Sequence, residues 1–154
     1  SLAYQKHGIK NTIFRPFSGY GSDQDLAYPF PSIIKRAINH DVKKDFIVWG
    51  SGYQMRDFIH IKDVVRGSLL IAKKIKNGKA VNLSSGKFLS FIKLSKKILN
   101  TLGKKIVSVY GNSTKPEGVY ARGGSRNIQK KFGFFPKITI DSGIKLAIED
   151  FKKK

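Results

Sequence analysis

The strongest constraint on this chain is the alternation of short apolar runs with segments of helical period. Runs rich in β-branched and aromatic residues predict strands at 9–17, 46–49, 56–61, 80–83 and 105–110. Between them, apolar side chains recur every three to four residues and predict helices at 31–38, 63–72, 91–102, 127–132 and 141–151. Strands that alternate with helices are typical of α/β proteins with parallel sheets. We therefore predict an α/β fold.

Local signals place the ends of several of these elements. Ser90 is a suitable N-cap for the helix that follows it, and Gly103 is suited to end that helix. Asp141 is expected to cap the last helix. The segments 18–31 and 111–124 are rich in residues that favour turns and predict loops.

Composition excludes several classes of protein. The 154 residues include no cysteine, which rules out a disulfide framework and a thiolate metal site. No apolar run approaches the ~18 residues that span a bilayer, so we expect no membrane partner. The first residues lack the apolar core of a signal peptide, and a cytoplasmic location is the expectation.

The formal net charge of +20 suggests a polyanionic partner, but its composition weakens the case for nucleic acid. Of the 30 basic residues only six are arginines, the side chain that reads guanine through two hydrogen bonds. The lysines are spread along the chain in twos and threes. A solvated lysine-rich surface explains this pattern best, and a polyanion-binding face or a positive cleft for a diphosphate remains as an alternative.

The sequence contains no complete catalytic constellation. Glycine-rich turns at 19–21 and 50–52 lack the third glycine of a dinucleotide loop. His7, His40 and His60 are too scattered to suggest a metal site, and we predict none. His60, within an apolar strand, is expected to be packed or hydrogen-bonded.

Four arginines occupy positions where an α/β protein binds ligands. Arg15 ends a predicted strand, Arg56 begins one after a glycine turn, and Arg122 and Arg126 flank a pair of glycines. Ligands of α/β folds lie beyond the carboxyl ends of strands, where a guanidinium group can hold phosphate oxygens. Pairing with a neighbouring acid, for example of Arg56 with a local aspartate, is an equally good explanation from spacing alone.

Several ordered motifs carry a family resemblance. Residues 15–21 (RPFSGYG) are similar to R-P-x-N-x-Y-G, and residues 48–65 (VWGSGYQMRDFIHIKDVV) to W-G-x-G-x-x-x-R-D-F-I-H-V-x-D-V. Residues 82–86 (NLSSG) and 115–122 (KPEGVYAR) resemble N-[IL]-G-S-G and K-P-x-G-x-x-x-R. Together they resemble the extended short-chain dehydrogenase/reductase family of nucleotide-sugar epimerases and dehydratases.

This resemblance implies a specific fold and extent. Residues 1–154 would form the carboxyl-terminal part of one epimerase/dehydratase domain, namely the end of a Rossmann-type doubly wound sheet plus the smaller substrate-binding lobe. The family's dinucleotide-binding half, its catalytic Ser or Thr and its Tyr-x-x-x-Lys pair are then expected upstream of residue 1. No catalytic residue is therefore assigned, and the chain alone is expected to be inactive.

The resemblance also implies roles for seven residues. Phe17 matches a position near the nicotinamide of NAD or NADP, and Ser18 stands where the family has an asparagine that contacts the sugar. The strand residues that match the surroundings of the nucleotide base are Ile47, Val48 and Trp49. The arginines that match the pair on the diphosphate are Arg56 and Arg122.

The resemblance implies an NAD(P)-dependent nucleotide-sugar epimerase (an isomerase) or dehydratase (a lyase), which acts by transient hydride abstraction from the sugar. The implied partner is a nucleoside-diphosphate sugar, and the complete protein would be compatible with a homodimer. Two alternatives are a basic nucleic-acid-binding module and a sugar-nucleotide-binding module that does no catalysis.

Overall fold

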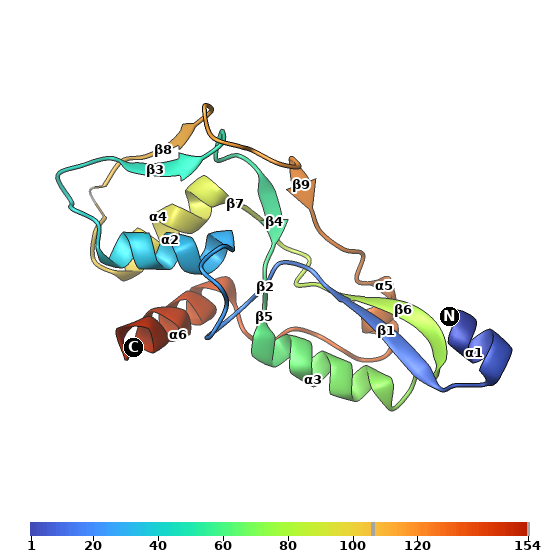
Figure 1. Ribbon diagram of the computed structural model, residues 1–154. Coiled ribbons are helices and arrows are strands. Elements are labelled where there is room, and N and C mark those ends of the chain that lie inside the picture. Colours follow the sequence, from blue (N-terminus) through green and yellow to red (C-terminus); the bar gives the residue numbers. More distant parts are fainter. Residues whose placement is uncertain (106, 154) are drawn as a thin grey trace.

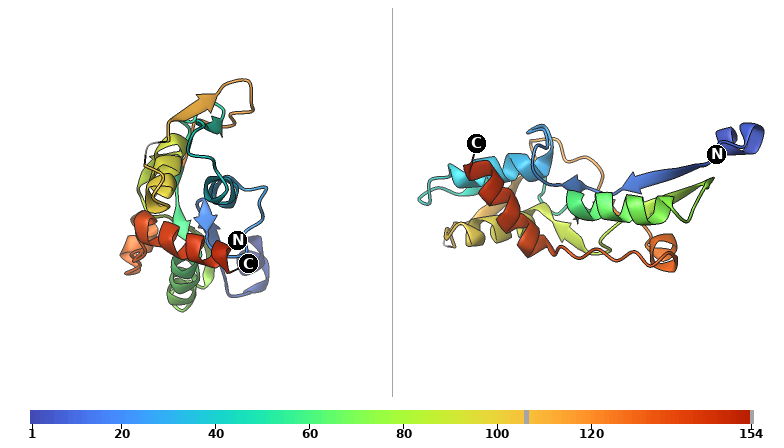
Figure 2. Two further views of the ribbon diagram at one scale, coloured as in Figure 1. Left: turned by 90° about the vertical axis from the view of Figure 1, so that its left-hand side faces the viewer. Right: turned by 90° about the horizontal axis from the view of Figure 1, so that it is seen from below.

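The computed structural model describes residues 1–105 and 107–153. Its elements form two groups along an elongated molecule, each with its own apolar core (Figure 1). The amino-terminal helix lies at one end, and the carboxyl-terminal helix lies in the opposite group (Figure 2).

The first group is a small parallel sheet with helices around it. Strands β1 (Asn11–Pro16) and β6 (Asn77–Leu83) run parallel, with Ile13 opposite Ala80. All of the chain from β2 (Gly19–Tyr20) to α3 (Ile61–Ala72) lies between these two strands in sequence. The helices of this group are α1 (Leu2–His7), α3 (Ile61–Ala72) and α5 (Asn127–Lys131). The buried core consists of Ile59, Ile71, Ile75, Val81, Leu83 and Phe134.

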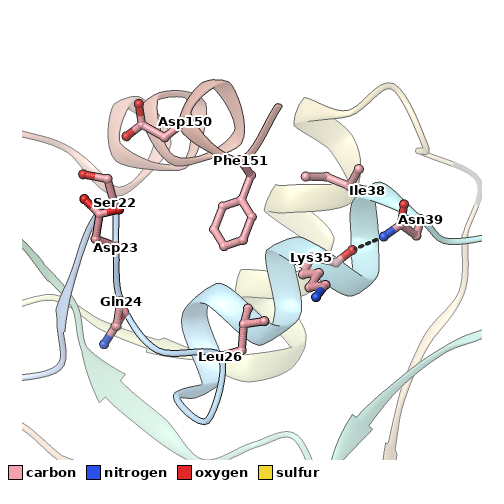
Figure 3. Close-up of a pocket in the computed structure, with 9 residues that line it drawn as sticks. All are labelled: Ser22, Asp23, Gln24, Leu26, Lys35, Ile38, Asn39, Asp150 and Phe151. Carbon is pink, nitrogen blue, oxygen red and sulfur yellow. Dashed lines mark hydrogen bonds between the residues drawn. The ribbon is translucent and has the colours of Figure 1, made fainter. Parts of the chain in front are cut away.

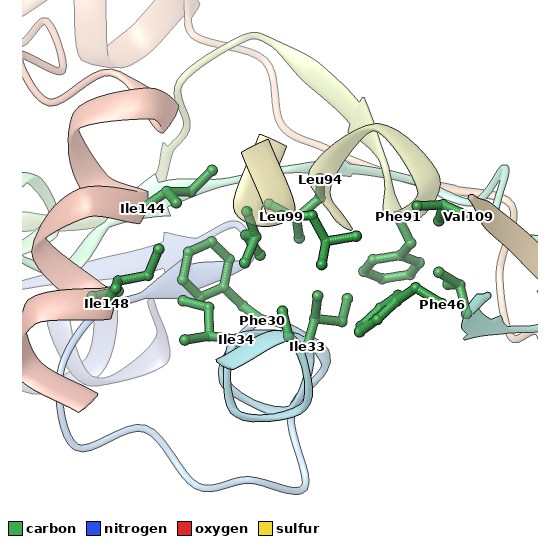
Figure 4. Close-up of a cluster of buried hydrophobic side chains, with 14 of the residues drawn as sticks. Phe30, Ile33, Ile34, Phe46, Phe91, Leu94, Leu99, Val109, Ile144 and Ile148 are labelled. Atoms are coloured by element: carbon green, nitrogen blue, oxygen red, sulfur yellow. The ribbon is translucent and has the colours of Figure 1, made fainter. Parts of the chain in front are cut away.

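The second group is a helical layer beside a second parallel pair. Its helices are α2 (Pro29–Ile38), α4 (Phe91–Thr101) and α6 (Ile140–Lys152). They bury one apolar face each, and their side chains interlock between the helices (Figure 4). Strands β3 (Phe46–Trp49) and β8 (Val109–Asn112) are parallel and close this core from one side.

Short strands connect the two groups. Strand β4 (Met55–Asp57) pairs antiparallel with β7 (Phe88–Ser90) and parallel with β9 (Ala121–Arg122). Strands β2 (Gly19–Tyr20) and β5 (Ile59–His60) form another parallel pair. The chain therefore returns to the middle of the molecule from both groups, and residues distant in sequence meet there.

The predicted α/β class is confirmed, with several differences at element boundaries. The strand expected over 56–61 is two strands with different partners, since β4 pairs with β7 and β9 whereas β5 pairs with β2. The buried Phe58 lies between them, and Ile61 already belongs to α3. Helix α2 begins at Pro29 instead of 31, and Thr139 caps α6 in place of Asp141, with its hydroxyl accepting from the Ser142 amide at 3.2 Å.

Other boundaries also shift. The strand expected over 105–110 begins only at Val109, and residue 106 of that expectation lies outside the described residues. The loop expected over 111–124 contains the end of β8 and all of β9. Ser90 caps α4 as expected, accepting from the Lys93 amide at 3.2 Å. Within the described ranges, no helix is long and apolar enough to cross a bilayer.

Candidate functional site

Two adjoining cavities lie in the middle of the molecule, where the short strands meet. The larger has a volume of about 590 Å³ and is lined by Phe17, Ser18, Arg56 and Arg122, among others. The smaller, of about 270 Å³, is lined by Val48, Trp49, Gln54 and Arg56. The two cavities share Pro29, Arg56 and Phe91, and together we call them the Arg56 groove.

Arg56 is the residue that both cavities have in common on β4. Its Nη1 donates to the carbonyl oxygens of Met55 at 2.9 Å and Val119 at 3.0 Å. The guanidinium carbon lies 5.3 Å from the centre of the Phe91 ring, a cation–π arrangement. These contacts fix the side chain without neutralising its charge.

Arg122 lies beside Arg56 on the neighbouring strand. The two residues are register partners in the parallel β4–β9 pair, and both line the larger cavity. Burial lowers the pKa of Arg56, and the positive charge of Arg122 lowers it further. In the described part of the chain the ion pairs are Arg66–Asp63 and Lys97–Asp141, so neither groove arginine is paired with an acid.

Phe17 and Ser18 form the wall of the larger cavity that follows the carboxyl end of β1. The Phe17 amide donates to the Leu83 carbonyl at 3.0 Å, which continues the β1–β6 ladder. A Cβ atom on Gly124 would lie 2.4 Å from the Phe17 ring, so only glycine permits this approach. Ser18 has φ of 37°, in the left-handed region that L-residues seldom adopt.

The three β3 residues predicted to contact the nucleotide base differ in their burial and in whether they line the groove. Val48 is buried, Trp49 is 60% exposed, and both line the smaller cavity. Lys115 places its ammonium nitrogen 6.0 Å from the centre of the Trp49 ring. Ile47 is exposed and lies outside the groove lining; its carbonyl oxygen accepts from Arg36 instead.

Two groove residues were missed by sequence reasoning. Gln54 is almost completely buried, and its Nε2 donates to the carbonyls of Trp49 at 3.3 Å and Glu117 at 3.1 Å. Arg36 lies over the Phe46 ring at 4.7 Å, and burial lowers its pKa. Neither residue belongs to a sequence pattern that indicates a ligand site. Each lines the groove because its side chain bonds backbone carbonyls of other segments.

The other two arginines singled out by the sequence do not line the groove. Arg15 is exposed on β1. Arg126 donates from Nη1 to the Ser85 carbonyl at 2.9 Å and thereby holds two loops together. The expectation that His60 is packed is confirmed, since it is buried and its Nδ1 accepts from the Lys62 amide at 3.1 Å.

A further cavity of about 480 Å³ lies between α2, the end of α6 and the loop around residue 24 (Figure 3). It shares Gln24 and Leu26 with the Arg56 groove, so this loop separates the two spaces. Its lining contains none of the residues predicted for ligand binding. Among the residues described, no cluster of His, Asp and Glu side chains could hold a metal ion.

Comparison with known proteins identifies the class. Residues 2–84, more than half of the chain, match the model of the NAD dependent epimerase/dehydratase family. The chain therefore belongs to this family, whose members use a nicotinamide dinucleotide, as the sequence motifs predicted.

Individual relatives extend the match over almost the whole chain. GDP-L-fucose synthase of Sinorhizobium fredii is 28% identical over 97% of this chain and 49% of its own length. An uncharacterized protein of Methanocaldococcus jannaschii is 32% identical over 90% of this chain and 42% of its own. The crystal structure of UDP-glucose 4-epimerase from Thermotoga maritima, with UDP-glucose, superposes on 99% of the chain and 49% of the epimerase. That superposition has a TM-score of 0.82 at 25% identity.

The chain thus spans about half the length of the relatives it matches. The neighbouring solved structures confirm the predicted fold, which is that of a Rossmann-type epimerase/dehydratase.

Proposed function

We propose that this chain supplies the substrate-binding half of an NAD(P)-dependent nucleotide-sugar epimerase or dehydratase. The observation that carries the proposal is that Arg56 and Arg122 line one cavity and neither is neutralised by a carboxylate. Two guanidinium groups suit the oxygens of a diphosphate, because charge-assisted hydrogen bonds are roughly twice as strong as neutral ones.

The order of residues along the groove supports the same substrate. Arg56 belongs to both cavities, with Phe17 and Ser18 in the larger and Val48 and Trp49 in the smaller. A diphosphate held at Arg56 would extend its sugar toward Ser18 and its base toward the exposed Trp49. Ile47 lies outside the groove lining, so we propose no contact between its side chain and the nucleotide base. Its neighbours Val48 and Trp49 would make that contact.

The residues present fit one part of the dinucleotide site. Phe17 offers a half-buried aromatic ring at the carboxyl end of a parallel strand, where α/β proteins bind dinucleotides. We propose that this ring contacts the nicotinamide of bound NAD or NADP. The sequence contains no glycine-rich dinucleotide loop, so groups outside this chain would hold the phosphates of the cofactor.

The chemistry would then be divided between this chain and the residues outside it. Bound NAD or NADP would supply a transient acceptor for a hydride from the sugar. The groove arginines hold the substrate and thereby fix the sugar carbon near Phe17, a positioning effect that can lower a barrier by several kcal/mol. None of the six tyrosines is followed by lysine four residues later, so the general base would come from elsewhere.

The proposal is tested by calorimetric titration of the chain with UDP-glucose and with GDP and UDP. We expect binding that Arg56→Ala weakens by about 1.5–3 kcal/mol, the scale of a hydrogen bond to a charged group. Arg15→Ala is the matched control, because it removes an exposed arginine that does not line the groove. Equal losses in both variants would show that the binding reflects only the net charge.

A sugar-nucleotide-binding function without catalysis is the second candidate, because a groove lined by two arginines without carboxylate partners could hold a diphosphate without any reacting group. Because the general base would come from outside this chain, an assay for epimerised or dehydrated product separates the two candidates when it is made on the protein that also contains that base. Binding to duplex DNA that falls steeply with salt and competes with nucleotide sugars would instead favour the nucleic-acid alternative.

A further inference from the structure

Asp57 is a fully buried carboxylate that follows Arg56 in sequence and forms no ion pair with it. Its Oδ1 accepts from the amide of Ser85 at 2.9 Å and from the Ser85 hydroxyl at 2.6 Å. Its Oδ2 accepts from the Gly86 amide at 3.0 Å and from the Ser84 hydroxyl. A buried charge is tolerated only when it is fully hydrogen-bonded, and here neutral donors alone satisfy it.

The turn that Asp57 holds, residues 84–86, contacts the segment that follows Arg122. The Ser84 hydroxyl lies 2.9 Å from the Gly124 carbonyl oxygen, and Arg126 donates to the Ser85 carbonyl at 2.9 Å. Gln129 bonds both the amide and the carbonyl of Ser84, each at 2.9 Å. The 84–86 turn therefore connects β4 to the loop that leaves β9.

The two arginines of the groove lie at the two ends of this connection. Arg56 is adjacent to Asp57, and Arg122 is two residues before Gly124. Direct pairing between the strands at this point is short, since β9 contains two residues and exposes both of them. The contacts through the turn add hydrogen bonds to buried groups and so restrict where Arg122 can lie.

We propose that Asp57 is a positioning residue, which fixes Arg122 relative to Arg56 through the 84–86 turn and leaves the charges of both guanidinium groups available to a diphosphate. This inference rests on the proposed function of the groove. An acceptor with two charged oxygens is required, because the turn presents four donors to the side chain. An asparagine offers only one acceptor oxygen and directs its amide group at donors.

A double-mutant cycle measures whether Asp57 acts through Arg122. We expect Asp57→Asn to weaken UDP binding about tenfold, the scale of one hydrogen bond to a charged group. In an Arg122→Ala background the same change should have little further effect, because residues that act as one unit are not additive. Ser84→Ala keeps the carboxylate but removes one of its four donors and the hydroxyl beside the Gly124 carbonyl. It is the second variant if Asp57→Asn folds poorly, and it should weaken UDP binding to a similar extent.

Asp63→Asn is the matched control. Asp63 is also buried, accepts from the amides of Lys137 at 2.9 Å and Ile138 at 2.8 Å, and lies outside the groove lining. It should lower stability without changing UDP affinity. Equal losses of affinity from both aspartate variants, or a loss from Asp57→Asn that persists undiminished without Arg122, would overturn the positioning role.

Amide hydrogen exchange separates this inference from the proposed function, because it needs no ligand. The Met55 amide donates to the Tyr120 carbonyl at 2.6 Å and reports on the attachment of β9. We expect Asp57→Asn, and not Asp63→Asn, to accelerate its exchange. Unchanged exchange would refute the positioning role even if UDP binds, whereas accelerated exchange in a chain that binds no nucleotide would refute only the proposed function.

Discussion

Arg56 and Arg122 are register partners on adjacent parallel strands, so two positive side chains lie next to each other without a carboxylate between them. Burial lowers the pKa of Arg56, and the nearby charge of Arg122 lowers it further, so both effects raise the free energy of the charged side chain in the folded protein. An arrangement that costs stability is typical of a binding site, where an anionic ligand supplies the missing negative charge.

The first prediction is that removal of the Arg122 side chain does not lower stability but weakens ligand binding. Arg122→Ala should leave the melting temperature unchanged or raise it at low salt, because it removes the repulsion from Arg56. The same variant should weaken UDP binding by about 10- to 100-fold. Calorimetric titration and thermal unfolding of the same sample measure both effects. A lowered melting temperature would mean that Arg122 is mainly a structural residue.

A second prediction concerns the end of α2. The Lys104 ammonium group donates to the carbonyls of Ala37, Ile38 and His40 at 2.8–2.9 Å, at the end of the helix, where the last carbonyls lack the amide four residues later that pairs with them inside a helix. Lys104→Met should therefore lower the free energy of unfolding by about 1–3 kcal/mol. The control is Lys105→Met, which removes a neighbouring exposed lysine and should cost less than about 0.5 kcal/mol. Urea unfolding of the two variants distinguishes them, and equal costs would contradict the prediction.

The local elements of this fold could be predicted from the sequence to a large extent. The strand at 46–49 and the helix after Ser90 follow from apolar period and capping, which are properties of neighbouring residues. The pairing of β3 with β8 could not be predicted, because it joins segments about 60 residues apart and depends on the whole core. For the same reason β9 was expected to be loop, since its two exposed residues carry no strand pattern.

In the candidate site, too, some residues could be predicted from the sequence and others depend on the tertiary fold. Family motifs indicated Phe17, Ser18, Val48, Trp49, Arg56 and Arg122, and the structure places all six along one groove. Their roles stay predictions until binding is measured. Gln54 and Arg36 were missed because their place in the lining depends on contacts with distant backbone carbonyls. Arg15 has a strong local signal but lies on the exposed side of β1.

A third prediction concerns pH. Burial lowers the pKa of His60 and the charge of Lys62 lowers it further, while Asp63 and Asp150 act in the opposite direction. Its ordinary value is about 6.5, so the unfolded chain takes up a proton there more readily than the folded one. Stability should therefore be complete above about pH 6.5 and fall as the pH decreases toward the lower folded pKa.

Urea midpoints between pH 5 and 8 test this prediction. His60→Asn is the comparison, because asparagine keeps an acceptor for the Lys62 amide and does not titrate. The decline between about pH 6.5 and 5 should be smaller in this variant than in the unaltered chain. The same decline in both proteins would assign the acid sensitivity to other groups.

The last prediction concerns Ser18, which lines the larger cavity with φ of 37°. Asparagine tolerates the left-handed region better than serine and has a longer side chain with an additional donor. Ser18→Asn should therefore not lower the melting temperature, and it should strengthen binding of UDP-glucose more than binding of UDP. Ser18→Ala provides the opposite comparison, with weaker UDP-glucose binding and an unchanged affinity for UDP. If UDP and UDP-glucose respond equally to both substitutions, Ser18 does not face the sugar.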